Sequence, residues 1–420
     1  MVTKQQQQTT LKEPTIVTRV VSAVIPAYSD VEIVKNSVVS LATQWIPDNT
    51  FRLEIIIVND NPKQDYSYFC SDAFKPIVNK NIDIVVLKNS ENYGQGISRQ
   101  IGIDNASSNW VVLCDEDDMY APNALFRFWE ILNEQHCGED GKPVALIAAP
   151  VYGFDICKER QIIHSGAIWV NGKMYNRQFL RENNIRFPEG ENSHRAEDYP
   201  FIESLNYAIE NSSTIYKRID FQDDADTFYY WIPNRDSRSR REEFYTALLT
   251  PFTMSSSLIM YNYMKEYNKF HNIEQDKDEF MKNKILNICI YFYLAYNKWL
   301  FDGNCGWTEN EKFLEKDWEL LKSNMTKMKK EIKKYWKEIC PSDIWDVLHG
   351  IKHESDIQFI EPFICPFNEW IEKGDKTEKM SFKQIKEYCK SLKFDESKHE
   401  ISTPYVKAWC ERHNIKNTIK

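Results

Sequence analysis

The chain has 420 residues, of which 42% are hydrophobic and 14% aromatic. This composition excludes a disordered chain and predicts a large folded core divided between two domains. The net charge of −9 argues against a protein dedicated to nucleic acid, although a local basic groove remains compatible with it.

The cysteines and the N-terminus bear on the cellular compartment. The ten cysteines are scattered, without a CxxC pair or zinc-site spacing, which is typical of reduced thiols. Residues 1–15 contain a glutamine run and no apolar leader, and they predict a disordered polar tail. No run of about 18 apolar residues occurs, so we expect a cytoplasmic protein without a membrane span.

Short apolar runs alternate with helical patterns in the first part of the chain. The runs VVSAVI, LEIIIV, IDIVVL and WVVLC, at 20–25, 53–58, 82–87 and 110–114, predict buried strands. Amphipathic segments lie between them, and Ser29 with Glu32 has capping-box spacing at the start of the first. This alternation predicts an α/β domain over 16–240 with a mostly parallel central sheet and right-handed crossovers.

The pattern changes beyond residue 140. The stretch 145–154 (ALIAAPVYGF) predicts one strand, and AEDYPFI opens a helix with two acids. From residue 241 onward the pattern predicts a mainly α-helical region, with capping-box spacing at Thr308 with Glu311 and at Ser381 with Gln384. No motif in 241–420 indicates chemistry, so this region either selects the substrate or builds a homo-oligomer.

Four acids follow the strand at 110–114 directly, in the sequence WVVLCDEDD. Ligands bind at the carboxyl ends of strands in open α/β sheets, and a buried strand would deliver these acids to that edge. Asp115 and Asp117 are separated by one residue, so both can reach one cation or diphosphate. Carboxylate oxygens suit Mg²⁺ or Mn²⁺. The structural alternative is an acidic turn after a strand.

Five motifs, in this order, resemble those of the inverting family 2 glycosyltransferases: SAVIPAYSD, VNDNP, NYGQGISRQIGIDNA, DEDDMYAP and AEDYPFI. The resemblance covers roughly residues 19–240 and gives no information about residues 241–420. It implies a GT-A fold that binds a nucleotide sugar and transfers the sugar with inversion, with Mn²⁺ or Mg²⁺ as cofactor.

The resemblance also implies roles for residues around the nucleoside. Asp60 matches the aspartate that reads the uracil imide N–H, and the alternative for it is an Asx-type turn. Asn59 replaces the aspartate that the family carries before it, which leaves a thymine nucleotide open. The residues expected to line the nucleoside pocket are Pro26, Ala27 and Tyr28.

Other residues match the positions for the diphosphate, the metal and the base. Arg99 falls at the arginine of the family, where a guanidinium pairs with phosphate oxygens or orients the aspartates of the metal loop. Asp117 is implied as the direct metal ligand, with Asp115 on the ribose or on metal-bound water. Asp198 matches the general base. For Glu197 and Asp198 the structural alternative is a pair of acids that complements the helix dipole.

Candidate acceptor contacts are His164, Gly166 and Lys173, at positions where such folds usually place them. The arginine-rich stretch at 234–241 either closes over the diphosphate or is a solvated linker.

The sequence therefore predicts a metal-dependent inverting glycosyltransferase that moves a sugar from a UDP-sugar to an acceptor hydroxyl. A glycan is the expected acceptor, with protein or modified phage DNA as alternatives. A nucleotidyltransferase would need a glycine-rich basic loop after the first strand, and PAYSD contains neither Gly nor Lys. A non-catalytic carbohydrate- or protein-binding module on the same fold is the remaining alternative.

Overall fold

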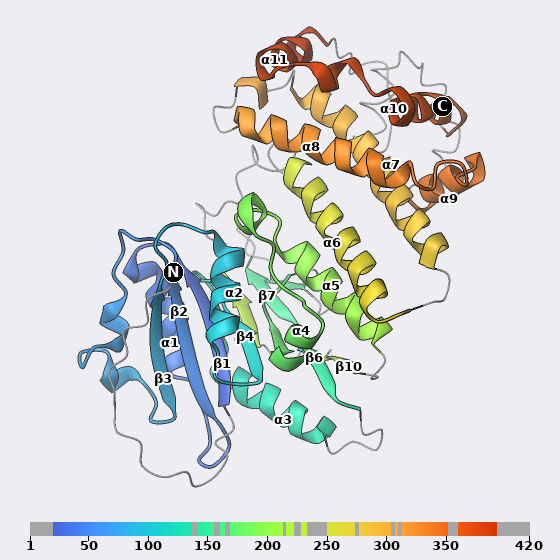
Figure 1. Cartoon of the computed structure of the whole chain (residues 1–420). Helices are drawn as coiled ribbons and strands as arrows, with labels where there is room; N and C mark the ends of the chain where they lie inside the picture. The colour runs from blue at the N-terminus through green and yellow to red at the C-terminus, as the bar shows by residue number, and fades with distance from the viewer. Residues whose placement is uncertain are drawn as a thin grey trace. The chain divides into compact units, whose positions relative to one another are not determined.

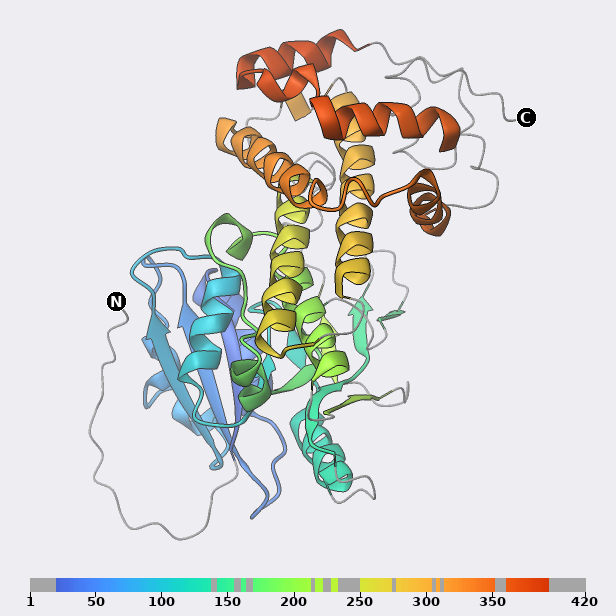
Figure 2. The same cartoon turned by 45° about the vertical axis from the view of Figure 1, so that its right-hand side comes forward.

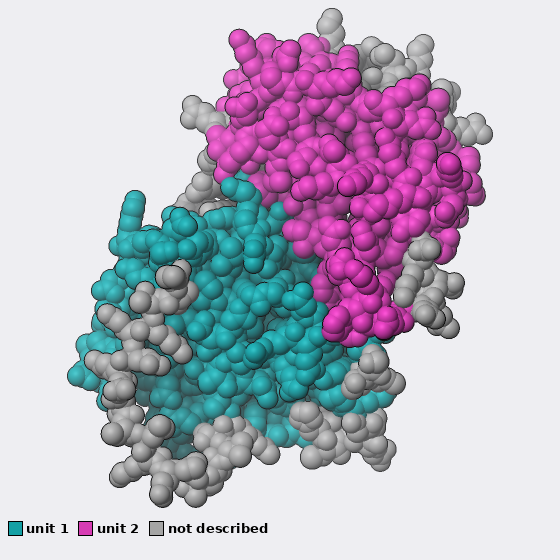
Figure 3. Space-filling view, viewed as in Figure 1, with its two compact units in different colours: residues 1–235 teal, residues 236–420 magenta. Residues whose placement is uncertain are grey.

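The computed structural model forms two compact units, residues 1–235 and 236–420 (Figure 3). It describes residues 20–136, 142–154, 160–163, 169–212, 216–221, 228–232, 250–273, 277–303, 307–309, 313–351 and 360–392. The predicted tail at 1–15 and the predicted boundary at 240/241 lie outside the described residues.

A seven-stranded sheet in the order β10-β6-β9-β4-β1-β2-β3 forms the centre of unit 1 (Figure 1). Its strands are β1 (Val20–Ala27), β2 (Arg52–Asn59), β3 (Ile82–Lys88), β4 (Trp110–Leu113), β6 (Val144–Ala148), β9 (Lys173–Asn176) and β10 (Lys217–Asp220). The strands β1 to β4 pair in parallel, as do β6 and β10, whereas β9 runs antiparallel to β4 and β6. The predicted mostly parallel sheet is confirmed.

A second sheet of four strands in the order β5-β11-β7-β8 corrects one prediction. Its strands are β5 (Met119–Tyr120), β7 (Val151–Phe154), β8 (Arg160–Ile163) and β11 (Tyr229–Trp231). The prediction of one strand over 145–154 is wrong, because the chain passes from β6 to β7 in the other sheet. Pro150 lies between these strands and has no backbone N–H to continue a ladder.

Helices cover the two faces of the main sheet. In unit 1 they are α1 (Val31–Ala42), α2 (Gln95–Asn105), α3 (Ala124–His136), α4 (Arg177–Glu182) and α5 (Asp198–Asn211), with short 3₁₀ helices η1 (Ser67–Cys70), η2 (Lys75–Ile77) and η3 (Gly190–Ser193). Alternate residues of β1, such as Ala23, pack in one core with Val34 and Val38 of α1. Val24 instead meets α2, where a Cβ on Gly102 would lie 2.2 Å from Val24 Cγ1. Gly102 therefore allows α2 to lie close against the sheet.

The first helix begins differently from its prediction. The N-cap residue of α1 is Asp30, without a side-chain cap, so the predicted Ser29 and Glu32 capping box is wrong. The Ser29 hydroxyl instead donates to Glu116, far along the chain. The predicted capping box of Ser381 and Gln384 is confirmed at α11 (Phe382–Ser391).

Unit 2 is helical over its described residues, as predicted. Its other helices are α6 (Thr250–Phe270), α7 (Lys277–Asp302), α8 (Glu315–Ile332), α9 (Pro341–Ile351) and α10 (Ile360–Lys373), with η6 (Trp307–Glu309) and η8 (Lys376–Lys379). Helices α6 and α7 lie side by side, and both contact α8 (Figure 2). In the core Trp299 stacks on Trp318, with the ring centroids 5.5 Å apart.

Two further observations concern the described residues as a whole. None of their helices is both long enough and apolar enough to cross a membrane. Their cysteines are free thiols, which agrees with the prediction from the scattered spacing: Cys70, Cys114, Cys289, Cys340, Cys365 and Cys389.

Candidate active site

The site is built at the carboxyl ends of three neighbouring parallel strands. β1 lies between β2 and β4, so the loops that follow these three strands meet at one edge of the sheet. These loops carry Tyr28, Asp60 and Asp115. The sequence had predicted that the acids would reach this edge, and the strand pairing explains how residues so far apart in sequence share it.

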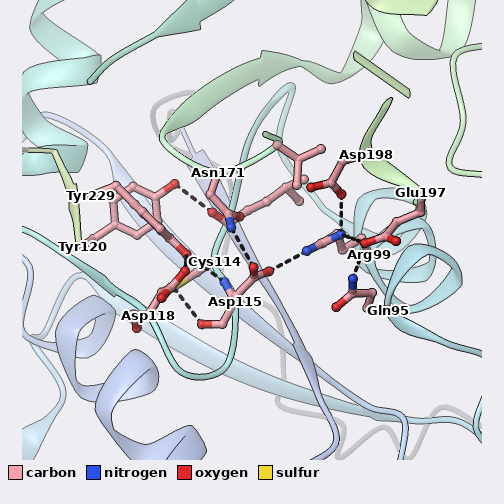
Figure 4. Close-up of polar contacts among 12 residues, drawn as sticks. Gln95, Arg99, Cys114, Asp115, Asp118, Tyr120, Asn171, Glu197, Asp198 and Tyr229 are labelled. Atoms are coloured by element: carbon pink, nitrogen blue, oxygen red, sulfur yellow. Dashed lines mark hydrogen bonds and ion pairs between the residues drawn. The ribbon is translucent and has the colours of Figure 1, made fainter. Parts of the chain in front are cut away.

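Arg99 of α2 joins three carboxylates at this edge (Figure 4). Its Nη2 lies 2.6 Å from Asp115 Oδ1, while its Nη1 lies 2.8 Å from Glu197 Oε1 and 2.9 Å from Asp198 Oδ1. The Arg99 side chain is 1% exposed, whereas those of Asp115 and Asp198 are each 30% exposed. The guanidinium therefore lies beneath two carboxylates that remain open to a ligand.

Burial and the neighbouring charges both shift the pKa values of Arg99 and Asp198. Burial by itself lowers the pKa of Arg99, but the three carboxylates hold that pKa well above its usual value. Burial raises the pKa of Asp198, Arg99 opposes this rise, and Glu197 and Asp115 add to it. Asp198 therefore binds a proton more readily than an ordinary aspartate, which is the property a general base needs near neutral pH.

Asp115 is held from both sides. Arg99 binds its Oδ1, and the Asn171 side chain donates from Nδ2 to its Oδ2 over 2.8 Å. The sequence does not predict this role of Asn171, because an Asn before a Gly indicates a turn but not which side chain the amide contacts. The buried Nε of Arg99 and Oδ1 of Asn171 have no hydrogen-bond partner within the described structure.

The fourth acid, Asp118, is buried and accepts hydrogen bonds from within the protein. It is 1% exposed and accepts the Tyr229 hydroxyl at 2.7 Å and the Ile232 N–H at 2.8 Å. Asp118 does not cap the next helix, because α3 begins only at Ala124. The Tyr229 hydroxyl also accepts the Asp115 N–H at 3.0 Å, so β11 is hydrogen-bonded to the loop that carries the four acids.

Asp60 holds the loop that leads into α2. Its Oδ1 accepts Asn89 Nδ2 and the Tyr93 N–H, and its Oδ2 accepts the Gly94 N–H, each at 2.8 Å. An ionised carboxylate offers about four lone-pair sites, so Oδ2 can accept one further donor. Gly94 has a φ of +87°, and a Cβ there would lie 2.8 Å from the His194 ring, which explains the glycine.

The remaining predicted site residues differ in exposure. Of those expected around the nucleoside, Pro26 and Ala27 are buried while Tyr28 is 49% exposed. Lys173 is 1% exposed and donates from Nζ to the Trp169 carbonyl at 2.6 Å. Burial lowers the pKa of Lys173 to about 8, and nearby Arg218 adds to this shift. His164, Gly166 and the arginine-rich stretch 234–241 lie outside the described residues.

The donor set at the edge fits a hard cation that is completed by substrate. Among the described residues no group of three or more His, Cys, Asp or Glu side chains is arranged to hold a metal ion. Mg²⁺ characteristically binds through one or two carboxylates together with substrate phosphates, so a loop with Asp115 and Asp117 fits this kind of site. Asp117 lies in the same loop and is partly exposed.

Part of the chain is similar in sequence to known proteins. Residues 22–190 match the model of Glycosyl transferase family 2, which makes this part of the chain similar to that family. A curated, uncharacterised glycosyltransferase of Methanocaldococcus jannaschii is 28% identical over 136 residues, 32% of this chain and 42% of that protein. The poly(ribitol-phosphate) beta-glucosyltransferase of Bacillus spizizenii is 26% identical over 227 residues, 51% of this chain and 32% of that protein. The chain therefore spans less than half the length of either relative.

Two solved structures of one bacterial protein also align with this chain. The crystal structure of S. aureus TarS 1-349 in complex with UDP aligns with a TM-score of 0.48 at 14% identity, covering 84% of this chain and 90% of that one. The same protein in complex with UDP-GlcNAc gives a TM-score of 0.48 at 15% identity, with the same coverage.

Proposed function

We propose that this protein is a metal-dependent inverting glycosyltransferase that moves a sugar from a UDP-sugar to an acceptor hydroxyl. One observation carries the proposal: a single buried guanidinium, Arg99, joins Asp198 to Asp115. The candidate base and the candidate donor-binding loop therefore lie in one site, although they are far apart in the chain. This site, more than the fold, indicates the activity, because a fold by itself does not determine one.

Asp60 supports a uracil donor. The remaining acceptor position on its Oδ2 can take the imide N–H of the base, while Pro26 and Ala27 end the neighbouring strand β1 and Tyr28 begins the loop after it. Thymine carries the same imide N–H, so TDP-sugars share this interaction. Three hydrogen bonds leave one acceptor position on the Asp60 carboxylate, but the residue is 3% exposed, so base recognition requires the imide N–H to reach a nearly buried oxygen.

Asp198 is proposed as the general base. The acceptor oxygen attacks the anomeric carbon while the bond from that carbon to the diphosphate oxygen breaks. The hydroxyl proton passes to a carboxylate oxygen of Asp198, and the nucleoside diphosphate leaves. A single displacement of this kind inverts the anomeric configuration and forms no covalent intermediate on the protein.

Asp117 is proposed as the metal ligand, with Asp115 beside it. Bound Mn²⁺ or Mg²⁺ neutralises negative charge on the departing diphosphate. Arg99 already compensates the charge of Asp115, which favours Asp117 as the more direct ligand. The burial of Arg99 also favours an orienting role for its guanidinium over direct contact with phosphate.

The acceptor is the least defined part of the proposal. A curated relative is described as a poly(ribitol-phosphate) glucosyltransferase, so a polyol-phosphate polymer is the first acceptor class to test. Other glycans, protein and nucleic acid belong in the same panel. Lys173 was a candidate acceptor contact, but its 1% exposure favours a role within the fold.

A donor screen tests the proposal without knowledge of the acceptor. Wild-type protein is incubated with a panel of UDP- and TDP-sugars, with and without Mn²⁺ or Mg²⁺, and release of the nucleoside diphosphate is measured. We expect metal-dependent release from a UDP-sugar by slow hydrolysis. If calorimetry detects no binding of UDP with Mn²⁺ at millimolar concentration, the non-catalytic alternative is favoured instead.

A further inference from the structure

Glu116, the second of the four acids after β4, is turned onto the loop that follows β1. Its Oε2 accepts the N–H groups of Tyr28 and Ser29 at 2.6 and 2.9 Å. Its Oε1 accepts the Ser29 hydroxyl at 2.5 Å. One carboxylate thus takes three hydrogen bonds from two consecutive residues and ties the proposed metal loop to the proposed nucleoside loop.

The same two residues are held from the other side as well. The Tyr28 carbonyl accepts Asn61 Nδ2 at 2.8 Å, and the Ser29 carbonyl accepts the Tyr66 hydroxyl at 2.5 Å. Every backbone N–H and C=O of Tyr28 and Ser29 is therefore bonded to a side chain from another segment. A loop whose backbone polar groups are all bonded in this way is held in one conformation.

The negative charge of Glu116 bears on how the diphosphate of the donor binds. A carboxylate between Asp115 and Asp117 adds negative charge where a diphosphate is proposed to bind, which by itself would oppose binding. The charge-assisted bonds to two backbone N–H groups compensate it. They leave the Tyr28 side chain 49% exposed on a fixed backbone.

We propose that Glu116 is a positioning residue for the donor nucleoside. By fixing the backbone of Tyr28 and Ser29, it forms the nucleoside-binding loop before the donor arrives, which reduces the ordering cost of binding. This inference rests on the proposed function and assigns to Glu116 a role separate from the metal.

Graded substitutions at Glu116 separate hydrogen bonding from charge. In Glu116→Gln the amide oxygen can still accept both backbone N–H groups, whereas Glu116→Ala loses every contact. Tyr66→Phe releases the same loop from its other side while keeping the ring. The control is Glu32→Ala on α1, because the Glu32 side chain is 82% exposed. Thermal unfolding of every variant shows that the fold is retained.

Two probes distinguish the nucleoside loop from the metal loop. The donor KM and kcat are measured together with the inhibition constants of UDP and of uridine, which has no phosphate and needs no metal. For Glu116→Ala we expect donor KM and both inhibition constants to rise about tenfold, with kcat changed by less than about twofold. Glu116→Gln and Tyr66→Phe should show smaller rises, and Glu32→Ala should show none.

Four outcomes would overturn the inference. An unchanged uridine constant with a weaker UDP constant would place the effect on the metal loop. A fall in kcat at constant KM would show that Glu116 does not act through ground-state binding. If wild-type protein bound neither UDP nor uridine, the proposed function would fail and the inference with it, whereas normal wild-type binding that Glu116→Ala leaves unchanged would overturn the inference alone.

Discussion

At the scale of single residues, the site is defined by the partners of three of its four adjacent acids. Asp115 is paired with Arg99 and Asn171, Glu116 with backbone N–H groups, and Asp118 with the Tyr229 hydroxyl. The sequence shows four adjacent acids but not these partners, because each partner lies in a distant segment. The sequence could therefore predict an acidic site at this edge, but it could not assign different roles to its members.

The raised pKa of Asp198 predicts a pH dependence. Only the ionised carboxylate can accept the acceptor proton, so kcat/KM should fall as pH drops through the pKa of Asp198 in the free protein. Burial places that pKa above the ordinary value of 3.8, and the acid limb should appear correspondingly above it. Measurement of kcat/KM against pH tests this, and a flat profile down to about pH 4 would contradict it.

Lys173 predicts a stability effect that does not depend on catalysis. Its pKa falls from 10.5 to about 8 on folding, so the folded state binds this proton more weakly than the unfolded state. The resulting decrease in the free energy of unfolding is complete below about pH 8, and it disappears as the pH rises towards 10.5. Lys173→Met should therefore raise the free energy of unfolding at pH 7 by about 1–2 kcal/mol, after loss of the bond to Trp169.

Denaturant unfolding at pH 7 and at pH 10 measures this effect of Lys173→Met. The matched control is Lys88→Met, because Lys88 is exposed at the end of β3. The gain should shrink at the higher pH for Lys173→Met and be small at both values for the control. An equal gain at both pH values would contradict the linkage.

At the scale of elements, the apolar runs of the sequence predicted the strands of the main sheet better than they predicted how the later segments connect. Strands β1 to β4 are apolar runs, and the pattern identified all of them. The split of 145–154 between two sheets could not be predicted from apolar pattern alone, because both halves are apolar and only Pro150 separates them. The capping box at Ser29 failed because a tertiary partner, Glu116, takes the hydroxyl.

The close packing of α2 on β1 matters for the site, because α2 carries Arg99. Gly102→Ala places a Cβ 2.2 Å from Val24 Cγ1, so the helix or the strand must shift. We expect a loss of about 1–2 kcal/mol in unfolding free energy, despite the better helix propensity of Ala, together with a lower kcat. The control Asn105→Ala changes an exposed position of the same helix and should alter stability by less than about 0.5 kcal/mol.

At the scale of the whole molecule, the proposed chemistry resides in unit 1. The family match ends at residue 190, and Asp198 opens the helix α5 shortly after it. Unit 2 has its own aromatic core, represented by Trp299 and Trp318. The sequence predicted its helical character and left its role open between substrate selection and oligomer formation. Whether unit 2 selects the acceptor can be measured once the donor is known.

The central claim is that Asp198 is the base of a site that binds its donor independently of that base. The most direct test compares wild-type protein with Asp198→Asn, using UDP binding by calorimetry in the presence of Mn²⁺ and transfer from the donor that the screen identifies. Glu203→Gln, an acid-to-amide change on the same helix, serves as the control. We predict that Asp198→Asn binds UDP within about threefold of wild type and loses transfer by at least about a hundredfold. Full transfer by Asp198→Asn would contradict the account.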